Sequence, residues 1–436
     1  MTADAADTRD RPAAGRSLRG DVLITFGGKA VFLLCVGLLT IIVARELGPS
    51  GQGVFATAFS LSLIFVQLGS LGLPVSNPYF AARDEQAQRA IVLHSLRLAV
   101  LVAALLCAGA VAVRAVAPGT LPGIGWLELG LTLAAMPAAL ATLYLQGVLL
   151  GQQRMVAYNL VEVVQAVSSL LALLIALAVA DIDIATVLLV IASGRYIALA
   201  YALFALRRVL LGPVVLRPGL LRGMLVHGGR VYLVGFVIFV LVRLDLLLVN
   251  ALVGSGDAGQ YSIAAYIAEG LVLIPMVIGI NLLPRIAKTS GSETSADVFR
   301  LVVLIWGAVC LLSAPGAAIG IPLLFGDSYD AAIELYLWLL PGTLAVGLLN
   351  SLTVHYFVRG YPPSLIAAWA AALVGNVVLN LILLPEWGVA AAPILSSVAY
   401  AGVLVAHLRF FGREVGGYRP LVPGMRDVRV LLRRIG

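Results

Sequence analysis

The sequence predicts an all-α membrane protein with about twelve transmembrane helices, arranged as two six-helix lobes around a central cleft. Composition is the first reason: of the 436 residues, 61% are hydrophobic and only 12% are charged, whereas soluble domains carry roughly 25% charged residues. The second reason is that apolar runs of about 18 residues or more, long enough to cross a bilayer, recur along nearly the whole chain. The third reason is an internal repeat that relates the two halves of the chain.

The first half of the chain begins with a polar tail, residues 1–20, which is predicted to be disordered and cytoplasmic. The apolar run that follows is too long for the core of a signal peptide, so it is interpreted as an uncleaved membrane anchor. Six spans then form a first lobe over residues 21–208. Glycine, proline and charged residues mark most of the turns, and the spans lie near 21–43, 53–76, 91–116, 126–150, 156–180 and 184–206.

The second half begins with residues 209–224, predicted to be a cytoplasmic linker between the lobes. A second lobe over residues 225–410 follows, with spans near 225–253, 257–284, 298–321, 331–357, 363–384 and 388–410. Residues 411–436 are predicted to be a basic cytoplasmic tail. An amphipathic helix lying on anionic lipid is the alternative for this tail. No loop is long enough to hold a separate soluble domain.

The basic residues predict the orientation, because Lys and Arg near the ends of spans stay in the cytoplasm. With the N-terminus inside, 24 of the 29 basic residues fall in inner segments. The outer loops hold only Arg45 and Arg114, together with several acids such as Asp181 and Asp257. Both termini are therefore predicted to be cytoplasmic. The pI of 9.5 reflects this topology and does not indicate nucleic acid.

Sequence motifs of enzymes and metal sites are absent. There is no phosphate loop of the form G-x-x-x-x-G-K-[ST], no serine in G-x-S-x-G and no H-E-x-x-H. The cysteines, Cys35, Cys107 and Cys310, fall inside apolar runs, which suits packing rather than a disulfide or metal framework. We therefore expect no enzyme activity and no cofactor.

An internal repeat appears at two places. LGPSGQGVFATA (47–58) matches VGSGDAGQYSIA (253–264) at a spacing of 206 residues, so that Gly53 aligns with Gly259. A weaker match pairs Gly151 with Gly360 at the inner end of the fourth span of each half. Because each half contains an even number of spans, both halves enter the membrane from the same side. The repeat predicts two bundles related by an axis along the membrane normal, with a cleft between them.

Three segments resemble polysaccharide flippases of the Wzx (O-antigen flippase) type. They are ARELGPSGQGVFATA (44–58), RLDLLLVNALVGSGDAGQYSIAAYIAE (243–269) and GNVVLNLILLPEWGVAAAPILSSVAY (375–400). The resemblance covers roughly residues 20–410. It implies membership of the multidrug/oligosaccharidyl-lipid/polysaccharide exporter superfamily. Such proteins move undecaprenyl-pyrophosphate-linked sugars across the cytoplasmic membrane by alternating access between two lobes.

Charged residues inside the spans are candidate site residues, because a mid-membrane charge costs about 2.5–3.5 kcal/mol and usually faces water or a partner. Six such residues occur, and the resemblance implies that the first, seventh and eighth spans line the cleft. Lys29, Arg243, Asp245 and Glu269 are on these spans. Glu162 and Arg195 are interpreted as structural. The alternative for all six is a set of buried ion pairs that join helices within a lobe.

Helix geometry refines the pair Arg243 and Asp245. At about 100° per residue their side chains point roughly 200° apart, so they cannot form an ion pair on one helix face. Arg243 shares its face with Asn250 and is predicted to face the cleft, while Asp245 turns toward a neighbouring helix. Tyr266 shares a polar face of the eighth span with Glu269. Other polar residues are expected mostly to join helices: Gln67, Asn77, Asn281, Asn350, Asn376 and Asn380.

The sequence thus predicts a lipid-linked oligosaccharide flippase of the bacterial cytoplasmic membrane. Arg243 is expected to bind the pyrophosphate with help from Lys29, because Arg offers a forked set of donors and Lys a point charge. Coupling to a proton or sodium gradient is expected at the acids. Glycan polymerases or glycosyltransferases are expected partners. The alternatives are an organic cation antiporter of the same superfamily and a non-transporting scaffold of glycan synthesis.

Overall fold

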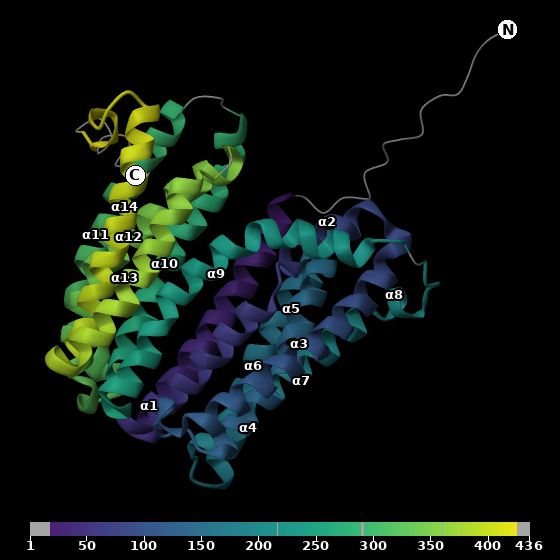
Figure 1. Cartoon of the computed structure of the whole chain (residues 1–436), viewed down its shortest axis with the longest axis horizontal. Helices are drawn as coiled ribbons and strands as arrows, with labels where there is room; N and C mark the ends of the chain where they lie inside the picture. Colours follow the sequence, from purple (N-terminus) through teal and green to yellow (C-terminus); the bar gives the residue numbers. More distant parts are fainter. Residues whose placement is uncertain (1–17, 216, 289–291, 360, 425–436) are drawn as a thin grey trace.

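A computed structural model describes residues 18–215, 217–288, 292–359 and 361–424 of the chain. Within these residues the protein is almost entirely helical and contains no β-strand. Figure 1 shows two bundles of long helices side by side, one from each half of the chain. We call them the N-lobe (α1–α8) and the C-lobe (α9–α14). The predicted all-α membrane fold is confirmed, while residues 1–17 and 425–436, predicted to be terminal tails, lie outside the described residues.

The N-lobe begins with α1 (Leu18–Gly69), which contains two spans joined by a kink at Gly48. Gly48 has φ of 64° and ψ of −180°, a conformation essentially restricted to glycine that would cost another residue about 1–3 kcal/mol, and Pro49 follows it. The remaining helices are α2 (Leu73–Arg83), α3 (Gln88–Val116), α4 (Trp126–Ala134), α5 (Met136–Gly151), α6 (Met155–Val179), α7 (Ile184–Ala205) and the short α8 (Arg207–Leu211). The second expected span is shorter than predicted, because a turn at Gly72, with φ of 73°, separates α1 from α2.

The C-lobe consists of α9 (Leu220–Leu252), α10 (Ser255–Lys288), α11 (Ser292–Phe325), α12 (Ala331–Arg359), α13 (Pro363–Trp387) and α14 (Ala391–Glu414). Nine stretches of the described residues are long and apolar enough to cross a membrane. Two of them, Gly27–Gly69 and Pro363–Glu414, each contain two passes, divided at Gly48 and Gly388. With α10 included, the twelve predicted spans are accounted for.

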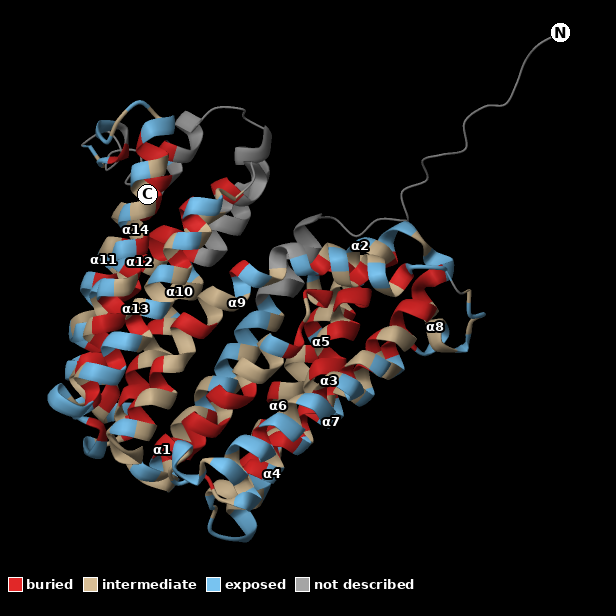
Figure 2. Ribbon diagram, in the orientation of Figure 1, coloured by how far each residue is buried: buried red, intermediate tan, exposed pale blue. Residues whose placement is uncertain are grey.

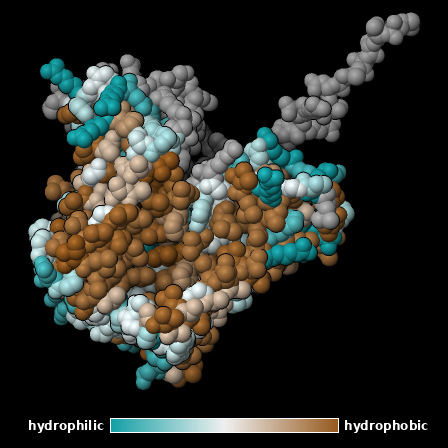
Figure 3. Space-filling model, viewed as in Figure 1, coloured by the Kyte–Doolittle hydropathy of each residue, from teal (hydrophilic) through white to brown (hydrophobic). Residues whose placement is uncertain are grey.

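Burial follows the division into lobes (Figure 2). The largest apolar core is formed by residues of α1 to α7 and the start of α9, and three smaller cores lie mainly in the C-lobe. Large apolar side chains also cover the outside, for example Leu105 on α3 and Leu311 on α11. Figure 3 shows hydrophobic surface over the middle of both lobes and hydrophilic residues toward the ends. This is the distribution expected of a molecule whose solvent is lipid.

The lobes meet closely at the end of the molecule that carries the α1 kink. A Cβ added to Gly53 would lie 1.8 Å from the carbonyl oxygen of Ser255, and one added to Gly259 would lie 1.9 Å from that of Pro49. Beside them, the Gln52 side chain donates a hydrogen bond of 3.2 Å to the Ser262 hydroxyl. The two glycines that the sequence repeat aligned therefore lie against each other's helices. The partner of Gly151 in the weaker match, Gly360, lies outside the described residues.

Further hydrogen bonds join the lobes at the same end. Arg45 donates to the carbonyl oxygens of Leu323 and Leu324 at 2.6 and 2.7 Å, and the Tyr329 hydroxyl donates to that of Ala44 at 2.9 Å. We call this contact, which includes Arg45, Gln52, Gly53, Gly259 and Ser262, the sealed end. Figure 1 shows the lobes diverging from it toward the opposite end, where α2 lies.

Helix α9 connects the lobes. Its first part packs on α2, where Gly228 lies against Gly72 and the His227 ring stacks on Tyr79 with centroids 4.4 Å apart. Its last part packs on α10, α13 and α14 inside the C-lobe. The candidate residues Arg243 and Asp245 lie on this last part, so the C-lobe positions them.

Candidate functional site

Arg243 and Asp245 have different neighbours, as helix geometry predicted. Arg243 on α9 donates through Nη2 to Glu269 Oε2 on α10 in a short ion pair. The guanidinium carbon lies 5.9 Å from the centre of the Tyr266 ring, which adds a cation–π contact. The pair is partly accessible, with side-chain exposures of 15% for Arg243 and 29% for Glu269.

Asp245 points into the C-lobe and is only 3% exposed. Its carboxylate accepts hydrogen bonds from the Ser396 hydroxyl at 3.0 Å, from the backbone N–H of Leu246 at 2.8 Å and from the Tyr261 hydroxyl. Among the described residues no ion pair involves Asp245. Neutral donors therefore stabilise a buried carboxylate, which is a costly arrangement unless a cation or proton is available to it.

Two asparagines of α13 extend this polar group. Asn376 donates to the Ser396 hydroxyl at 3.4 Å, and Asn380 donates to the Asn376 side-chain oxygen at 3.1 Å and to its carbonyl oxygen at 2.9 Å. Both asparagines are buried. Asn376 joins α13 to α14, as expected of a membrane asparagine, whereas Asn380 donates only within α13. The side-chain oxygen of Asn380 has no hydrogen-bond partner among the described residues.

A cavity of about 180 Å³ inside the C-lobe connects the two acids. Both Asp245 and Glu269 line it, with Tyr261, Thr343 and Tyr400 and otherwise apolar side chains from α9, α10, α12 and α14. A volume of this size holds several water molecules or a small ion with its waters. The Tyr266 hydroxyl is buried and has no hydrogen-bond partner among the described residues. The cavity is mainly apolar, but a partly accessible acid, Glu269, and a buried one, Asp245, both face it.

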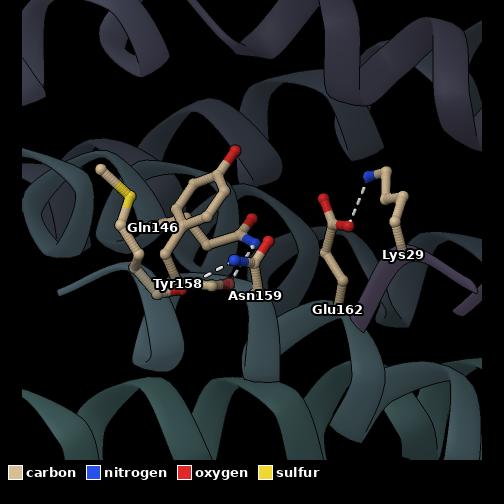
Figure 4. A network of polar contacts seen from close by, with 6 residues as sticks. Lys29, Gln146, Tyr158, Asn159 and Glu162 are labelled. Atoms are coloured by element: carbon tan, nitrogen blue, oxygen red, sulfur yellow. Dashed lines mark hydrogen bonds and ion pairs between the residues drawn. The ribbon is translucent and has the colours of Figure 1, made fainter. Parts of the chain in front are cut away.

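Lys29 forms the corresponding ion pair of the N-lobe. Its Nζ lies 2.6 Å from Glu162 Oε2 on α6, and it also lies 5.2 Å from the centre of the Phe32 ring. Figure 4 shows the pair beside two hydrogen bonds: Asn159 donates to the Met155 carbonyl oxygen within α6, and Gln146 of α5 donates to that of Tyr158 on α6. With side-chain exposures of 47% for Lys29 and 28% for Glu162, this pair is more open than that of Arg243.

The other predicted residues lie elsewhere. Asn250 is buried near the sealed end, where it donates to the Pro122 carbonyl oxygen at 3.0 Å and so joins the two lobes. Arg195 is buried in the N-lobe, where it donates to the Ser62 hydroxyl at 2.7 Å. The structure thus brings Arg243, Glu269 and Tyr266 together with Asp245 behind them. It pairs Lys29 with Glu162 and leaves Asn250 at a separate contact.

Sequence reasoning missed four residues of the C-lobe cavity and its lining network: Tyr261, Thr343, Ser396 and Tyr400. Hydroxyl side chains are common in membrane helices as helix-joining groups, so none of them differs in the sequence from its neighbours. The sequence signal that could have identified Ser396 is its position in PILSSVAY, which belongs to the segment 375–400 that resembles the flippases. Which hydroxyl reaches Asp245 depends on how the helices pack, and the sequence does not specify that.

Comparison with known proteins adds a family and a fold. A family model described as polysaccharide biosynthesis protein matches residues 21–290. No curated protein matches the chain at a significant level.

Among solved structures, the chain is similar to the lipid II flippase MurJ in an inward closed conformation. The TM-score is 0.67 at 11% identity, covering 89% of this chain and 87% of the flippase. The MATE multidrug transporter DinF-BH gives a TM-score of 0.66 at 14% identity, with 93% and 96% covered. An inward-facing multidrug resistance MATE transporter of the MOP superfamily gives 0.63 at 12% identity, with 90% and 98% covered. These likenesses show a shared fold.

Proposed function

Because the chain belongs to the polysaccharide biosynthesis protein family, we propose that it is a flippase for lipid-linked oligosaccharide. It moves an undecaprenyl-pyrophosphate glycan from the inner to the outer leaflet of the bacterial cytoplasmic membrane by alternating access of its two lobes. The observation that carries this proposal is Arg243 on α9. Its side chain is partly accessible and pairs with a single carboxylate, that of Glu269, which a substrate phosphate can replace. A guanidinium in this position suits the phosphate oxygens of a lipid headgroup.

The substrate enters from the cytoplasmic side in the conformation described. The distribution of basic residues puts both termini in the cytoplasm, which makes the sealed end the outer one and the diverging end the inner one. The glycan then leaves to the outside once the sealed end opens.

Each lobe contributes one cation to the headgroup. Arg243 comes from the C-lobe and Lys29 from the N-lobe, and in the absence of substrate each pairs with a carboxylate of the neighbouring helix. Two cations from opposite lobes suit a pyrophosphate, which carries more than one negative charge. Cytoplasmic glycosyltransferases that build the glycan and a polymerase that extends it outside are the partners that this role requires.

A proton or sodium gradient drives the cycle in this proposal. The support is the C-lobe cavity, which two carboxylates line, one of them fully buried with neutral donors around it. In vesicles loaded with lipid-linked glycan, an imposed gradient of one of these ions should accelerate flipping, and Asp245→Asn should remove the acceleration. If flipping responds to neither gradient, this coupling is wrong.

The experiment that tests the flippase itself is an Arg243→Ala exchange in the native host. Undecaprenyl-linked glycan should accumulate on the cytoplasmic side, measured by mass analysis of the lipid fraction, and surface polysaccharide should fall. Arg243→Lys, which keeps the charge but loses the fork, should lie between the wild type and Arg243→Ala. Normal surface polysaccharide in Arg243→Ala cells, at wild-type levels of membrane-inserted protein, would contradict the assignment.

One observation favours a second function, transport of organic cations. The C-lobe cavity combines two acids with the rings of Tyr261 and Tyr400, and acids with aromatic side chains suit a cationic ligand. A deletion strain would then become sensitive to cationic drugs while its undecaprenyl-linked intermediates stay normal. The flippase predicts the opposite pair of results.

A further inference from the structure

The N-lobe contains a buried positive charge that no acid balances among the described residues. Arg195 on α7 is 5% exposed, and its one hydrogen bond within the described residues runs from Nη1 to the Ser62 hydroxyl on α1 at 2.7 Å. None of the salt bridges in this part of the chain involves it. A guanidinium carries five N–H donors, and a buried charge without a counter-charge is costly. Arg195 therefore lacks a negative partner.

A small void adjoins the Arg195 side chain. It lies between α1, α4 and α7, beside Ala135 at the break between α4 and α5, and has a volume of about 10 Å³. Apart from Arg195, the polar side chains that line it are Ser62 and Thr132. A void of this size has room for about one water-sized particle. Its lining contains no negative charge, so the void offers Arg195 space for a partner without supplying one.

The donors at this void lack strong acceptors. The Ser62 oxygen accepts from Arg195, and the hydroxyl proton is directed to Met136 Sδ at 3.8 Å, a weak acceptor. The Thr132 hydroxyl differs, because it donates to the Glu128 carbonyl oxygen within α4 at 2.8 Å. An occupant of the void must therefore accept hydrogen bonds, and one negative charge on it would neutralise Arg195.

We propose that this void is a binding site for a small monovalent anion, a halide such as chloride. The guanidinium of Arg195 and the hydroxyl of Ser62 donate to the ion, and the charge-assisted contact to the guanidinium is the stronger of the two. The size of the void excludes larger anions, and its lining moves slightly to admit an ion a little larger than water. The bound ion joins α1 to α7 inside the N-lobe, in the opposite lobe from Arg243. A water molecule would fit the same volume but would leave the charge of Arg195 uncompensated.

The test compares thermal unfolding of the purified full-length protein, in nanodiscs of uncharged lipid, in sodium chloride and in sodium gluconate of equal ionic strength. Chloride should raise the midpoint of the wild type in a saturable way, by about 2–4 °C at about five times the dissociation constant of the ion. Bromide should act as chloride does, whereas gluconate is too large for the void. The effect of chloride is compared within each protein, so a change in a variant's own stability does not enter the result.

Three variants locate the effect. Arg195→Met should lose the chloride effect, and in gluconate, where the buried charge has no counter-ion, it should be at least as stable as the wild type. Ser62→Ala keeps the charge and should keep the chloride effect. Arg97→Met is the matched control: Arg97 is exposed on α3 of the same lobe, so its loss should leave the chloride effect unchanged.

A direct measurement uses crystals of the full chain grown with bromide in place of chloride. An anomalous difference peak should lie within hydrogen-bond reach of the Arg195 guanidinium. An equal chloride effect in wild type and Arg195→Met would overturn the proposal, because the anion then acts elsewhere. A wild-type midpoint independent of chloride, or wild-type bromide crystals without a peak at Arg195, would show that no halide occupies the void. If Arg195→Met does not fold, these two measurements on the wild type still decide.

Discussion

Arg195 is a charged residue that no acid neutralises within the part of the chain that the structure describes. It is 5% exposed, and its guanidinium donates a hydrogen bond of 2.7 Å to the Ser62 hydroxyl. Burying an ion costs several kcal/mol, which a single hydroxyl does not recover. The residue therefore reduces the stability of the N-lobe unless it has a role in the transport cycle.

This reasoning predicts opposite effects for two substitutions. Arg195→Met removes the buried charge and keeps much of the volume, so the midpoint of thermal unfolding in detergent should stay level or rise. Ser62→Ala leaves a buried donor without its acceptor and should lower the stability by about 1–3 kcal/mol. A fall for both variants would show that Arg195 has a further partner. The double variant should resemble Arg195→Met.

The directions of single side chains could be predicted better than their partners. The period of the α-helix separates Arg243 from Asp245 by roughly 200°, and the structure gives them different neighbours. That Arg243 meets Glu269, or that Lys29 meets Glu162 across 133 residues, depends on which helices lie side by side. Helical periodicity contains no information on that choice. The sequence therefore predicts that buried ion pairs can join helices, but not which acid pairs with which base.

At the scale of helices, the close contact of α1 with α10 depends on glycine at two positions. A Cβ at residue 53 would lie 1.8 Å from the Ser255 carbonyl oxygen. Rotation of a side chain cannot relieve this clash, because the position of a Cβ is fixed by its own backbone and the oxygen belongs to the backbone of α10. Gly53→Ala should therefore open the sealed end and favour an outward-facing molecule. Distance measurements between spin labels on the two lobes at the sealed end, one near the α1 kink at Gly48 and one near Phe325 at the end of α11, should report a wider separation.

The control for this exchange is Gly256→Ala in the same interface. There a new Cβ meets only the Ser50 hydroxyl at 3.5 Å, an ordinary contact, so the label distances should match the wild type. Unchanged distances in Gly53→Ala would mean that the helices shift along each other instead of separating.

The linker before α9 is fixed to the N-lobe by an ion pair outside the spans. Arg217 Nε lies 2.9 Å from Asp84 Oδ2, and this hydrogen bond lowers the pKa of Asp84. The folded protein then binds the Asp84 proton more weakly than the unfolded chain does. The ion pair therefore stabilises the folded protein fully at a pH above 3.8, the ordinary pKa of an aspartate. This stabilisation is lost as the pH falls through the lowered pKa that Asp84 has in the folded protein.

The expected result is that Arg217→Gln reduces the stability at neutral pH slightly and leaves it unchanged in strong acid. Thermal unfolding midpoints measured from pH 7 downward should converge for the two proteins. The effect is small because both groups are exposed to solvent. A difference that persists in strong acid would show that Arg217 acts through another contact.

Some helix boundaries could not be read from hydropathy. The turn at Gly72 divides a segment that the sequence presents as one span, and α2 continues as a separate helix. Similarly, the fourth span is interrupted at Ala135, between α4 and α5, although LTLAAMPAAL contains no charged residue. Pro137 lies in the first turn of α5. Proline is tolerated there because a backbone N–H at this position would have no acceptor within the helix. Hydropathy measures transfer to lipid and is insensitive to such interruptions.

For the whole molecule, the all-α membrane fold with about twelve spans was predictable, because lipid requires each crossing helix to be long and apolar. That the aligned glycines Gly53 and Gly259 lie where the halves touch is shown by the structure and was not predicted from the repeat. The conformational state was not predictable, since a protein that works by the proposed alternating access has the same sequence in both states, and their free energies differ little. In the proposed cycle, the sealed end is one of two arrangements.

A final prediction concerns that cycle. In a protein whose Cys35, Cys107 and Cys310 are replaced, cysteines at Gln52 and Ser262 would face each other across the sealed end, where the native side chains are in hydrogen-bond contact at 3.2 Å. Both positions are buried while the end is sealed, so a short bis-methanethiosulfonate reagent should reach them when that end opens during the proposed cycle and, once both thiols have reacted, hold it closed. Flipping of lipid-linked glycan in vesicles should stop and should resume after reduction, while each single-cysteine protein should be unaffected. Because the glycan must leave where the lobes now touch, undiminished flipping by fully cross-linked protein would mean that the lobes do not separate at this end during transport.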